Sequence, residues 1–228
     1  MSDKKHAEDM DSGAAAIAKA KDFWTRNNKP IMIACAVVIL LGGGWLVYKN
    51  FFKNPKEAKA AEAMFRAESY YRMDSLNLAL NGDGQNLGFL KVISKYDGTE
   101  AANQANYYAG VIYIKLDQNE KAIKHLKEFS TSSKQVQARA YSLMGDAYAD
   151  MGKGKDALEY YKKAAHHFEE DKFNSADALF RAAYLAEQVL NDKEEAIKLY
   201  KEIKEKYPAE KGNDADLHLA KLGVYNVN

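Results

Sequence analysis

The stretch NGDGQNLG, which begins at Asn81, combines glycines with acidic and amide side chains as ligand-binding loops do. A phosphate-binding loop would follow a strand and lead into Gly-Lys-Ser or Gly-Lys-Thr, and the sequence has neither feature here. A calcium loop would take oxygen ligands from Asn81, Asp83 and Gln85. It would also need a glycine in place of Asn86 and a bidentate glutamate in place of Val92. The stretch therefore predicts a turn between two helices.

The adjacent histidines His166 and His167 are the next candidates for chemistry. Neighbouring residues of a helix point about 100° apart, so the two side chains cannot share a metal ion without help, and a solvated helix end is the better interpretation. Paired carboxylates fall in charge-rich helix faces or turns, at Glu169-Glu170 and Glu194-Glu195. The sequence predicts no catalytic residue, no metal site and no cofactor. An enzyme with a bound cofactor or a deep pocket of titrating groups stays an alternative.

The composition favours one globular domain with an appendage. Of the 228 residues, 47% are hydrophobic and 29% are charged. Lys and Arg total 33 against 32 acidic residues, so the chain lacks the basic excess by which proteins bind nucleic acid. Its one cysteine, Cys35, lies in an apolar stretch. The rest of the chain therefore has no thiol for disulfides, metal ligation or nucleophilic catalysis.

That apolar stretch, at residues 31–48, contains no charged side chain. As a helix it would be roughly 27 Å long, close to the ~30 Å hydrocarbon core of a bilayer. Trp45 lies towards its end, and Lys29 and Lys49 bracket it, as expected of residues at the two membrane interfaces. We therefore predict a transmembrane helix over residues 31–52, which contacts the lipid bilayer.

A cleavable signal peptide is the alternative to a permanent anchor. Gly42 and Gly44 follow an apolar segment and could precede a cleavage site. The segment before the apolar run is long for a signal, however, and apolar residues follow the cleavage point, so we favour the anchor. Positive charges are balanced on the two sides of the span and do not set its orientation. We expect residues 1–30 to form a short polar cytoplasmic tail, because large domains translocate whatever their charge.

Two segments after the apolar stretch repeat each other. Residues 107–129 and 142–164 align without a gap at an offset of 35 residues. The alignment superimposes three pairs of residues: Gly110 on Gly145, Tyr113 on Tyr148, and Ala122 on Ala157. A spacing of this length is typical of architectures in which pairs of helices stack on one another.

A third segment, residues 180–208, repeats the second half of this pattern through Ala196, Tyr200 and Pro208. An insertion around residues 169–174 stretches the last offset to 39 residues. This register places Tyr184 where the earlier repeats have glycine and Glu187 where they have tyrosine. We therefore expect the first helix of the third repeat to pack differently.

These residues resemble the tetratricopeptide repeat, in which a small residue lets the two helices of a pair touch and stacked pairs supply the core. The resemblance implies an all-α fold: an N-terminal transmembrane helix, then a tetratricopeptide-repeat α-solenoid with about three repeats. Residues 55–101 are expected to form a modified first helical pair, with a helix from Pro55 to about Asn81. Residues 102–228 are expected to hold the repeats and a capping helix that Asp214 begins. An irregular helical bundle is the alternative.

In such a solenoid the first helix of each pair lines a groove that binds proteins. The usual groove positions mix aromatic, apolar and charged side chains and favour a protein segment over a small molecule. They fall on Gln104, Tyr107, Val111, Ile114, Lys115, Arg139, Ser142, Asp146, Asp150, Arg181 and Gln188. Val111 and Ile114 could equally be core residues.

The whole arrangement resembles the YfgM-type ancillary subunit of the bacterial SecYEG translocon. The stretch NLALNGDGQNLGFLKVISKYDGTEAANQANYYAGVIYIKL is particularly similar to membrane-anchored repeat proteins of this kind. The resemblance implies a single-pass inner-membrane protein with its C-terminal domain in the periplasm. It also implies three protein partners: the SecYEG translocon, a PpiD-like chaperone and emerging polypeptides. A scaffold for envelope assembly or cell division is the alternative function.

Overall fold

The computed structural model describes residues 2–225, so residue 1 of the expected tail and residues 226–228 of the expected repeat domain lie outside it. The chain divides into two compact units, Met1–Pro55 and Lys56–Asn228. All regular elements of the described residues are helical, and one isolated bridge between Gly82 and Leu87 is the single β-type pairing among them. The predicted all-α class is confirmed.

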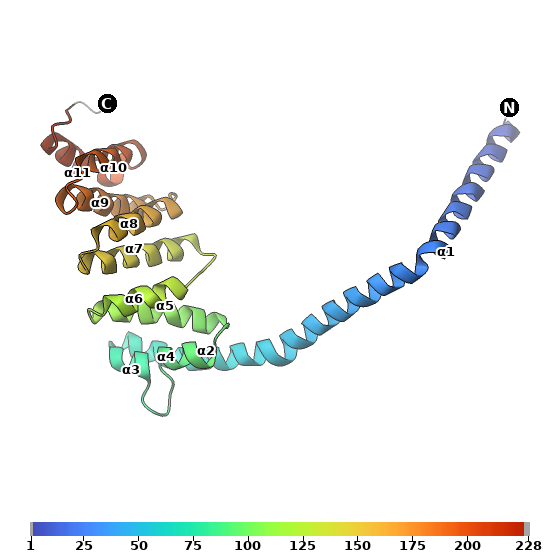
Figure 1. Ribbon diagram of the computed structural model, residues 1–228, viewed down its shortest axis with the longest axis horizontal. Coiled ribbons are helices and arrows are strands. Elements are labelled where there is room, and N and C mark those ends of the chain that lie inside the picture. Colours follow the sequence, from blue (N-terminus) through green and yellow to red (C-terminus); the bar gives the residue numbers. More distant parts are fainter. Residues whose placement is uncertain (1, 226–228) are drawn as a thin grey trace. The chain divides into compact units, whose positions relative to one another are not determined.

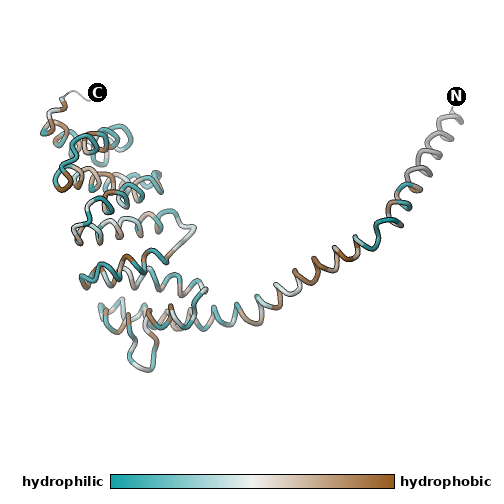
Figure 2. The backbone as a smooth tube through the Cα atoms, viewed as in Figure 1, coloured by the Kyte–Doolittle hydropathy of each residue, from teal (hydrophilic) through white to brown (hydrophobic). Residues whose placement is uncertain are grey.

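The first unit consists of helix α1 (Ser2–Tyr48) and the π-helical segment η1 (Lys49–Lys53). Figure 2 shows an apolar run in α1 with hydrophilic turns on either side. From Met32 to Tyr48 the large apolar side chains of this run are exposed, from 48% for Val37 to 73% for Leu40. This helix is long and apolar enough to span a membrane.

The second unit is a stack of helices joined by short connections (Figure 1). The helices are α2 (Asn54–Arg72), α3 (Leu76–Asn81), α4 (Phe89–Lys95), α5 (Glu100–Lys115), α6 (Asn119–Glu128), α7 (Lys134–Asp150), α8 (Gly154–His167), α9 (Lys172–Gln188), α10 (Lys193–Lys206) and α11 (Pro208–Lys221). Helices α5 and α6, α7 and α8, and α9 and α10 pack as antiparallel pairs, and each pair packs against the next. The core lies between the pairs, which no pair could bury alone.

Glycine sets the close approach within the first two pairs. A Cβ atom added to Gly110 would lie 2.5 Å from Leu126 Cγ, and one added to Gly145 would lie 2.6 Å from Tyr161 Cδ1. Both distances are well below the ~3.5 Å at which carbon atoms pack favourably. The predicted role of the small residue in the repeat is therefore seen in both pairs.

The third pair corrects the register that the sequence predicts. Gly110, Gly145 and Ala183 each lie five residues before the end of their helix. Ala183 is fully buried, whereas Tyr184 is 48% exposed, so Ala183 and not Tyr184 takes the small-residue position. One of the extra residues lies in the turn between α9 and α10, which has four residues where the turn between α7 and α8 has three.

The expected helix from Pro55 to Asn81 is wrong at its end. Helix α2 stops at Arg72, and α3 begins only at Leu76. Asp74 takes a left-handed conformation with φ of 55° between them, and Ser75 N–H donates to the Tyr70 carbonyl at 2.9 Å. Asp74 in this conformation reverses the chain, and no proline or glycine in the sequence marks the end of the helix there.

The last helix also begins earlier than expected. Helix α11 starts at Pro208, which occupies its first turn, and Asp214 lies in the helix interior, where it pairs with Lys211 at 3.0 Å. Proline is favoured at a helix start because its missing N–H would have no partner there. Helix α11 still covers α10, as a capping helix should.

A nearly buried hydrogen-bonded contact holds α11 on the stack. Glu187 Oε2 of α9 lies 2.6 Å from His218 Nδ1 of α11 and accepts a hydrogen bond from Tyr200 Oη at 2.8 Å. The side chains of Glu187 and His218 are only 9% and 12% exposed. Burial opposes ionisation of Glu187, but the hydrogen bonds from Tyr200 and His218 hold its pKa below its usual value. In the corrected register the small-residue position holds Ala183 and the position three further on holds Ala186, so Tyr184 and Glu187 no longer support the expectation that this helix packs differently.

Candidate functional site: a pocket across three helices

The corrected register defines one face of the solenoid, here called the groove face. Its residues lie at equivalent places in α5, α7 and α9, eleven, eight and four residues before each helix ends. This spacing puts three side chains of each helix on one side. The nine residues are Gln104, Tyr107, Val111, Arg139, Ser142, Asp146, Asp177, Phe180 and Tyr184.

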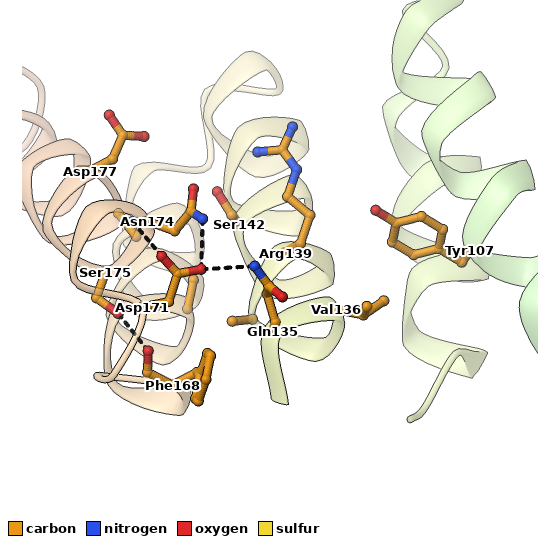
Figure 3. Close-up of a pocket in the computed structure, with 13 residues that line it drawn as sticks. Tyr107, Gln135, Val136, Arg139, Ser142, Phe168, Asp171, Asn174, Ser175 and Asp177 are labelled. Atoms are coloured by element: carbon orange, nitrogen blue, oxygen red, sulfur yellow. Dashed lines mark hydrogen bonds between the residues drawn. The ribbon is translucent and has the colours of Figure 1, made fainter. Parts of the chain in front are cut away.

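A pocket of about 380 Å³ lies on this face, between α7 and α9 (Figure 3). Tyr107 reaches it from α5, Arg139 and Ser142 line it from α7, and Asp177 lines it from α9. Val136 and Phe168 add apolar surface, and Val136 is 38% exposed. The pocket therefore offers charged, hydroxyl and apolar groups together, as protein-binding surfaces do.

Asp171, which begins α9, contributes the carboxylate at the floor of the pocket. It accepts hydrogen bonds from the backbone N–H and the side-chain amide of Asn174, at 3.3 and 2.8 Å, and from Gln135 Nε2 at 3.2 Å. The Asn174 side chain contributes most to holding the Asp171 pKa below its usual value. Because all three donors are neutral, the negative charge of Asp171 is not cancelled.

The other acidic groups of the groove face are paired. Arg181 donates to Asp146 Oδ1 and to Asp177 Oδ2, at 2.8 Å in each case. Tyr161 Oη also donates to Asp146, at 2.8 Å. Burial, followed by the charge of Asp146, raises the pKa of Tyr161, which stays neutral as a donor. Arg181 thus bridges carboxylates of α7 and α9, and its one positive charge offsets one of their two negative charges.

Arg139 has no such partner. Among the described residues no carboxylate lies within ion-pair distance of its guanidinium, and the pocket residue with which it interacts is Tyr107. Burial raises the pKa of Tyr107, while the Arg139 charge opposes that shift. Arg139 is an exposed side chain that lines the pocket. Its positive charge is therefore available to a ligand.

The structure divides the sequence-predicted groove residues into four groups. Tyr107, Arg139 and Ser142 meet in the pocket, and Asp146 and Arg181 form an ion pair beside it. Val111 and Ile114 are partly buried against the core, as the alternative interpretation of these two residues expects. The remaining predicted residues do not line the pocket; they are Gln104, Lys115, Asp150 and Gln188.

Sequence reasoning missed Asp177, Phe180 and Tyr184 because it misplaced the third repeat by one residue. In the corrected register Asp177 is the counterpart of Arg139, and a count from the helix ends would have found it. It also missed Asp171 and Phe168, which belong to the connection into α9. The sequence of residues 171–174, Asp-Lys-Phe-Asn, carries the signal of a helix start at Asp171 and does not include Phe168.

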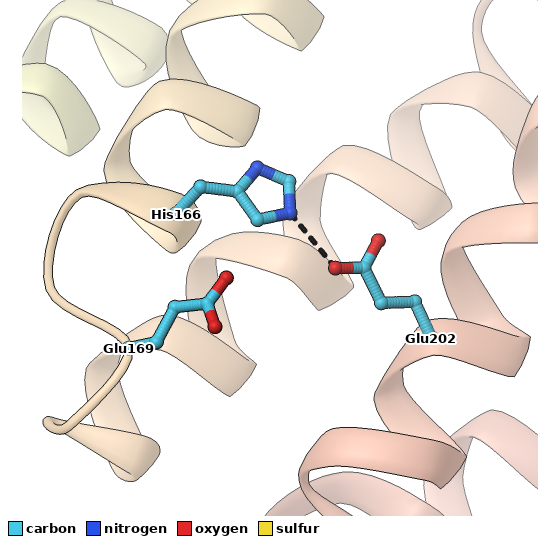
Figure 4. Close-up of side chains that lie close together, drawn as sticks. All are labelled: His166, Glu169 and Glu202. Carbon is cyan, nitrogen blue, oxygen red and sulfur yellow. Dashed lines mark hydrogen bonds and ion pairs between the residues drawn. The ribbon is translucent and has the colours of Figure 1, made fainter.

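A second cluster, shown in Figure 4, has the donor types of a metal site. One ligand atom each of His166, Glu169 and Glu202 lies within 4.8 Å of the others. However, Lys206 Nζ lies 2.9 Å from the Glu169 carboxylate and 3.1 Å from that of Glu202. The ammonium group of Lys206 already bridges the two acids, so we interpret the cluster as an ion-pair network joining α8 to α10. His167 instead turns to the ring of Tyr141.

The NGDGQNLG stretch is a structural loop between α3 and α4, as predicted. Its only charged side chain, Asp83, accepts hydrogen bonds from Tyr70 Oη at 2.6 Å and from the backbone N–H groups of Gln85 and Asn86 at 2.9 and 2.6 Å. These bonds, led by that of the Asn86 backbone, hold the Asp83 pKa far below its usual range. The carboxylate thus organises the loop itself.

Comparison with known proteins identifies the repeats. The model of the tetratricopeptide repeat matches residues 104–132 and 177–209. No curated protein matches the chain significantly. The first match covers most of α5 with α6 and the second covers most of α9 with α10, while α7 and α8 between them repeat the same glycine-mediated contact. The chain therefore contains tetratricopeptide repeats within a stack of helices, which follows a helix long and apolar enough to span a membrane.

Proposed function

We propose that the chain is a membrane-anchored, non-enzymatic module that binds a protein segment on its groove face. The observation that carries the proposal is the pocket, where Arg139 presents an uncompensated charge beside the apolar surface of Val136 and Phe168. A solenoid presents such a surface on rigid helices, so the solenoid itself loses little conformational entropy when it binds a segment. Tetratricopeptide repeats are a protein-interaction fold, which supports a protein partner.

We further propose that the module is an ancillary subunit of the SecYEG translocon. In this proposal the N-terminus is cytoplasmic, residues 31–52 cross the bacterial inner membrane, and the repeats lie in the periplasm beside a PpiD-like chaperone. The support is the resemblance of the sequence to YfgM-type subunits and the apolar helix ahead of the repeats. An anchor at the channel would raise the effective concentration of emerging chains, so that weak contacts suffice for handover.

Site-specific cross-linking tests whether the groove face is the contact surface. A photo-reactive amino acid is placed at Gln104, which is exposed on the groove face of α5, in the full-length protein in native membranes. The matched control is Lys155, which is exposed on α8 outside the groove face. We expect light-dependent products with other proteins from Gln104 and not from Lys155. Products from Lys155 alone, or equal products from both positions, would refute groove binding.

The identity of the products tests the finer proposal. Mass spectrometry of the Gln104 products should find SecYEG subunits, a PpiD-like chaperone or polypeptides in transit. Groove-specific products that contain only cell-division or envelope-assembly proteins would replace the translocon proposal with the scaffold alternative. A mild-detergent pull-down, with residues 31–52 exchanged for an unrelated span, shows whether the anchor itself contributes to the association.

A further inference from the structure

The pocket on the groove face has two charges of opposite sign that no side chain of the described residues cancels. Arg139 of α7 has no carboxylate partner, and Asp171 at the start of α9 is hydrogen-bonded only to neutral amides. The remaining charged side chain of the pocket, Asp177, is paired with Arg181. The pocket is thus positive on its α7 side and negative at the start of α9.

Apolar side chains line the same space as these two charges. Val136 stands one helical turn before Arg139 on α7, and Phe168 precedes Asp171 in the connection from α8. Figure 3 shows Val136 on one side of Gln135 and Phe168 below Asp171. The two charged and the two apolar side chains thus line the same pocket.

We propose that the pocket binds an extended protein segment that carries an acidic, an apolar and a basic side chain at alternate positions. The acidic side chain pairs with Arg139, the basic one pairs with Asp171, and the apolar one packs against Val136 and Phe168. This inference rests on the proposed function, and it defines the class of segment that the groove face accepts.

The alternate spacing follows from the geometry of an extended chain. Side chains two residues apart point to the same side, so the three groups can face the pocket together. The outer two lie about 13 Å apart along the chain, enough to reach from one helix to a neighbouring one. A carboxylate placed on Arg139 can accept two parallel N–H bonds, which fixes its orientation. A C-terminal carboxylate would fill only the positive side and leave Asp171 unmatched.

Fluorescence anisotropy with synthetic peptides tests this pattern. The probes are labelled, amidated peptides with Asp, Phe and Lys at alternate positions of a Gly/Ser background, made in both orders, and the protein is the full chain in mild detergent. One order should bind more tightly than the other, because the helices give the pocket a direction. Replacing the acid by Asn in the tighter peptide should weaken binding about fivefold, as expected of a largely exposed ion pair.

Protein variants assign the effect to the two pocket charges. Arg139→Gln should weaken binding of the tighter peptide about fivefold. It should not change binding of the Asn-substituted peptide, because that peptide already lacks the acid that pairs with Arg139. Asp171→Asn should do the same for the basic side chain, and asparagine retains the helix cap. Lys155→Gln is the matched control, since it removes one exposed positive charge outside the pocket.

The results separate this inference from the proposed function. The charge pattern would be overturned by any of three results. All peptides could bind equally, neither order of the peptide could bind, or Arg139→Gln could weaken binding no more than Lys155→Gln does. Groove-specific cross-links from Gln104 together with any of these results would leave the groove face as a protein-binding surface with another preference. Loss of both the cross-links and the peptide binding would overturn both.

Discussion

The close approach of paired helices at Gly110 can be tested by a single methyl group. Gly110→Ala places a Cβ atom 2.5 Å from Leu126 Cγ and 3.3 Å from the Ala122 carbonyl oxygen. Leu126 is fully buried, so its side chain cannot move aside freely. Over-packing of this kind costs about 1–3 kcal/mol, which exceeds the ~1 kcal/mol that alanine gains over glycine in a helix. We expect a net loss of about 1 kcal/mol.

Gly212 provides the matched control for this substitution. It is also helical and buried, but a Cβ atom there would meet only Pro208 Cβ, at an ordinary 3.7 Å. Gly212→Ala should therefore stabilise the protein by up to about 1 kcal/mol through helix propensity. The two variants should differ by roughly 2 kcal/mol in the free energy of unfolding.

Urea unfolding of the full chain in mild detergent, followed by far-UV circular dichroism, measures this difference. With a denaturant slope of about 2 kcal/mol per molar, the midpoints of the two variants should lie about 1 M apart. Comparison of midpoints is preferable to fitted free energies, because stacked repeats need not unfold in one step. A Gly110→Ala midpoint that rises as far as that of Gly212→Ala would refute the close approach of α5 and α6.

Three further substitutions probe the ionic contacts. Glu187→Gln should lower the thermal midpoint at neutral pH. Because the folded-state pKa of Glu187 is depressed, the stability that its carboxylate contributes is present above the ordinary pKa of 4.5 and is lost as pH falls through the folded-state pKa. The difference in midpoint between wild type and variant should therefore close on acidification, and a difference that does not depend on pH would refute this reasoning. Asp83→Asn should speed amide hydrogen exchange of Gln85 and Asn86; unchanged exchange would show that Asp83 does not organise the loop. Lys206→Ala should lower the free energy of unfolding by less than about 1 kcal/mol in low salt, and a loss of stability that persists in high salt would contradict an electrostatic origin.

The parts of the fold that sequence predicts best are those set by local sterics. Gly110 and Gly145 mark the helix crossings because no larger residue fits there, and their spacing reveals the first two pairs. The apolar run at residues 31–48 is equally local, since length and lack of charge define it. Such signals need no knowledge of the neighbours of a helix.

Features that depend on a single residue in a connection are not predictable in this way. The end of α2 depends on the left-handed conformation of Asp74, a residue type that helices also tolerate. The turn after Gln188 has one residue more than the equivalent turn after α7, which shifted the expected register by one residue. The alignment therefore predicted Tyr184 in the core, whereas the structure has it on the groove face. An alignment of repeats cannot locate such an insertion without knowing where each helix stops.

The pocket is predictable only in part, for a different reason. Tyr107 and Arg139 could be chosen because groove positions repeat along the sequence. Which charges are free depends on contacts between distant residues: Arg181 neutralises Asp146, 35 residues away, and leaves Arg139 unpaired. Only the structure shows that balance.

The contact between Glu187 and His218 affects whether a second copy of the chain can add to the end of the helix stack. In an array of interchangeable repeats, the final apolar face invites another copy to add, and heterologous contacts of that kind propagate into fibres. Here the last repeat carries a nearly buried carboxylate that α11 satisfies through one histidine. A foreign helix without a matching donor would strand that charge, at a cost of about 3–5 kcal/mol. Helix α11 and its contact with Glu187 therefore disfavour end-to-end polymerisation of the chain.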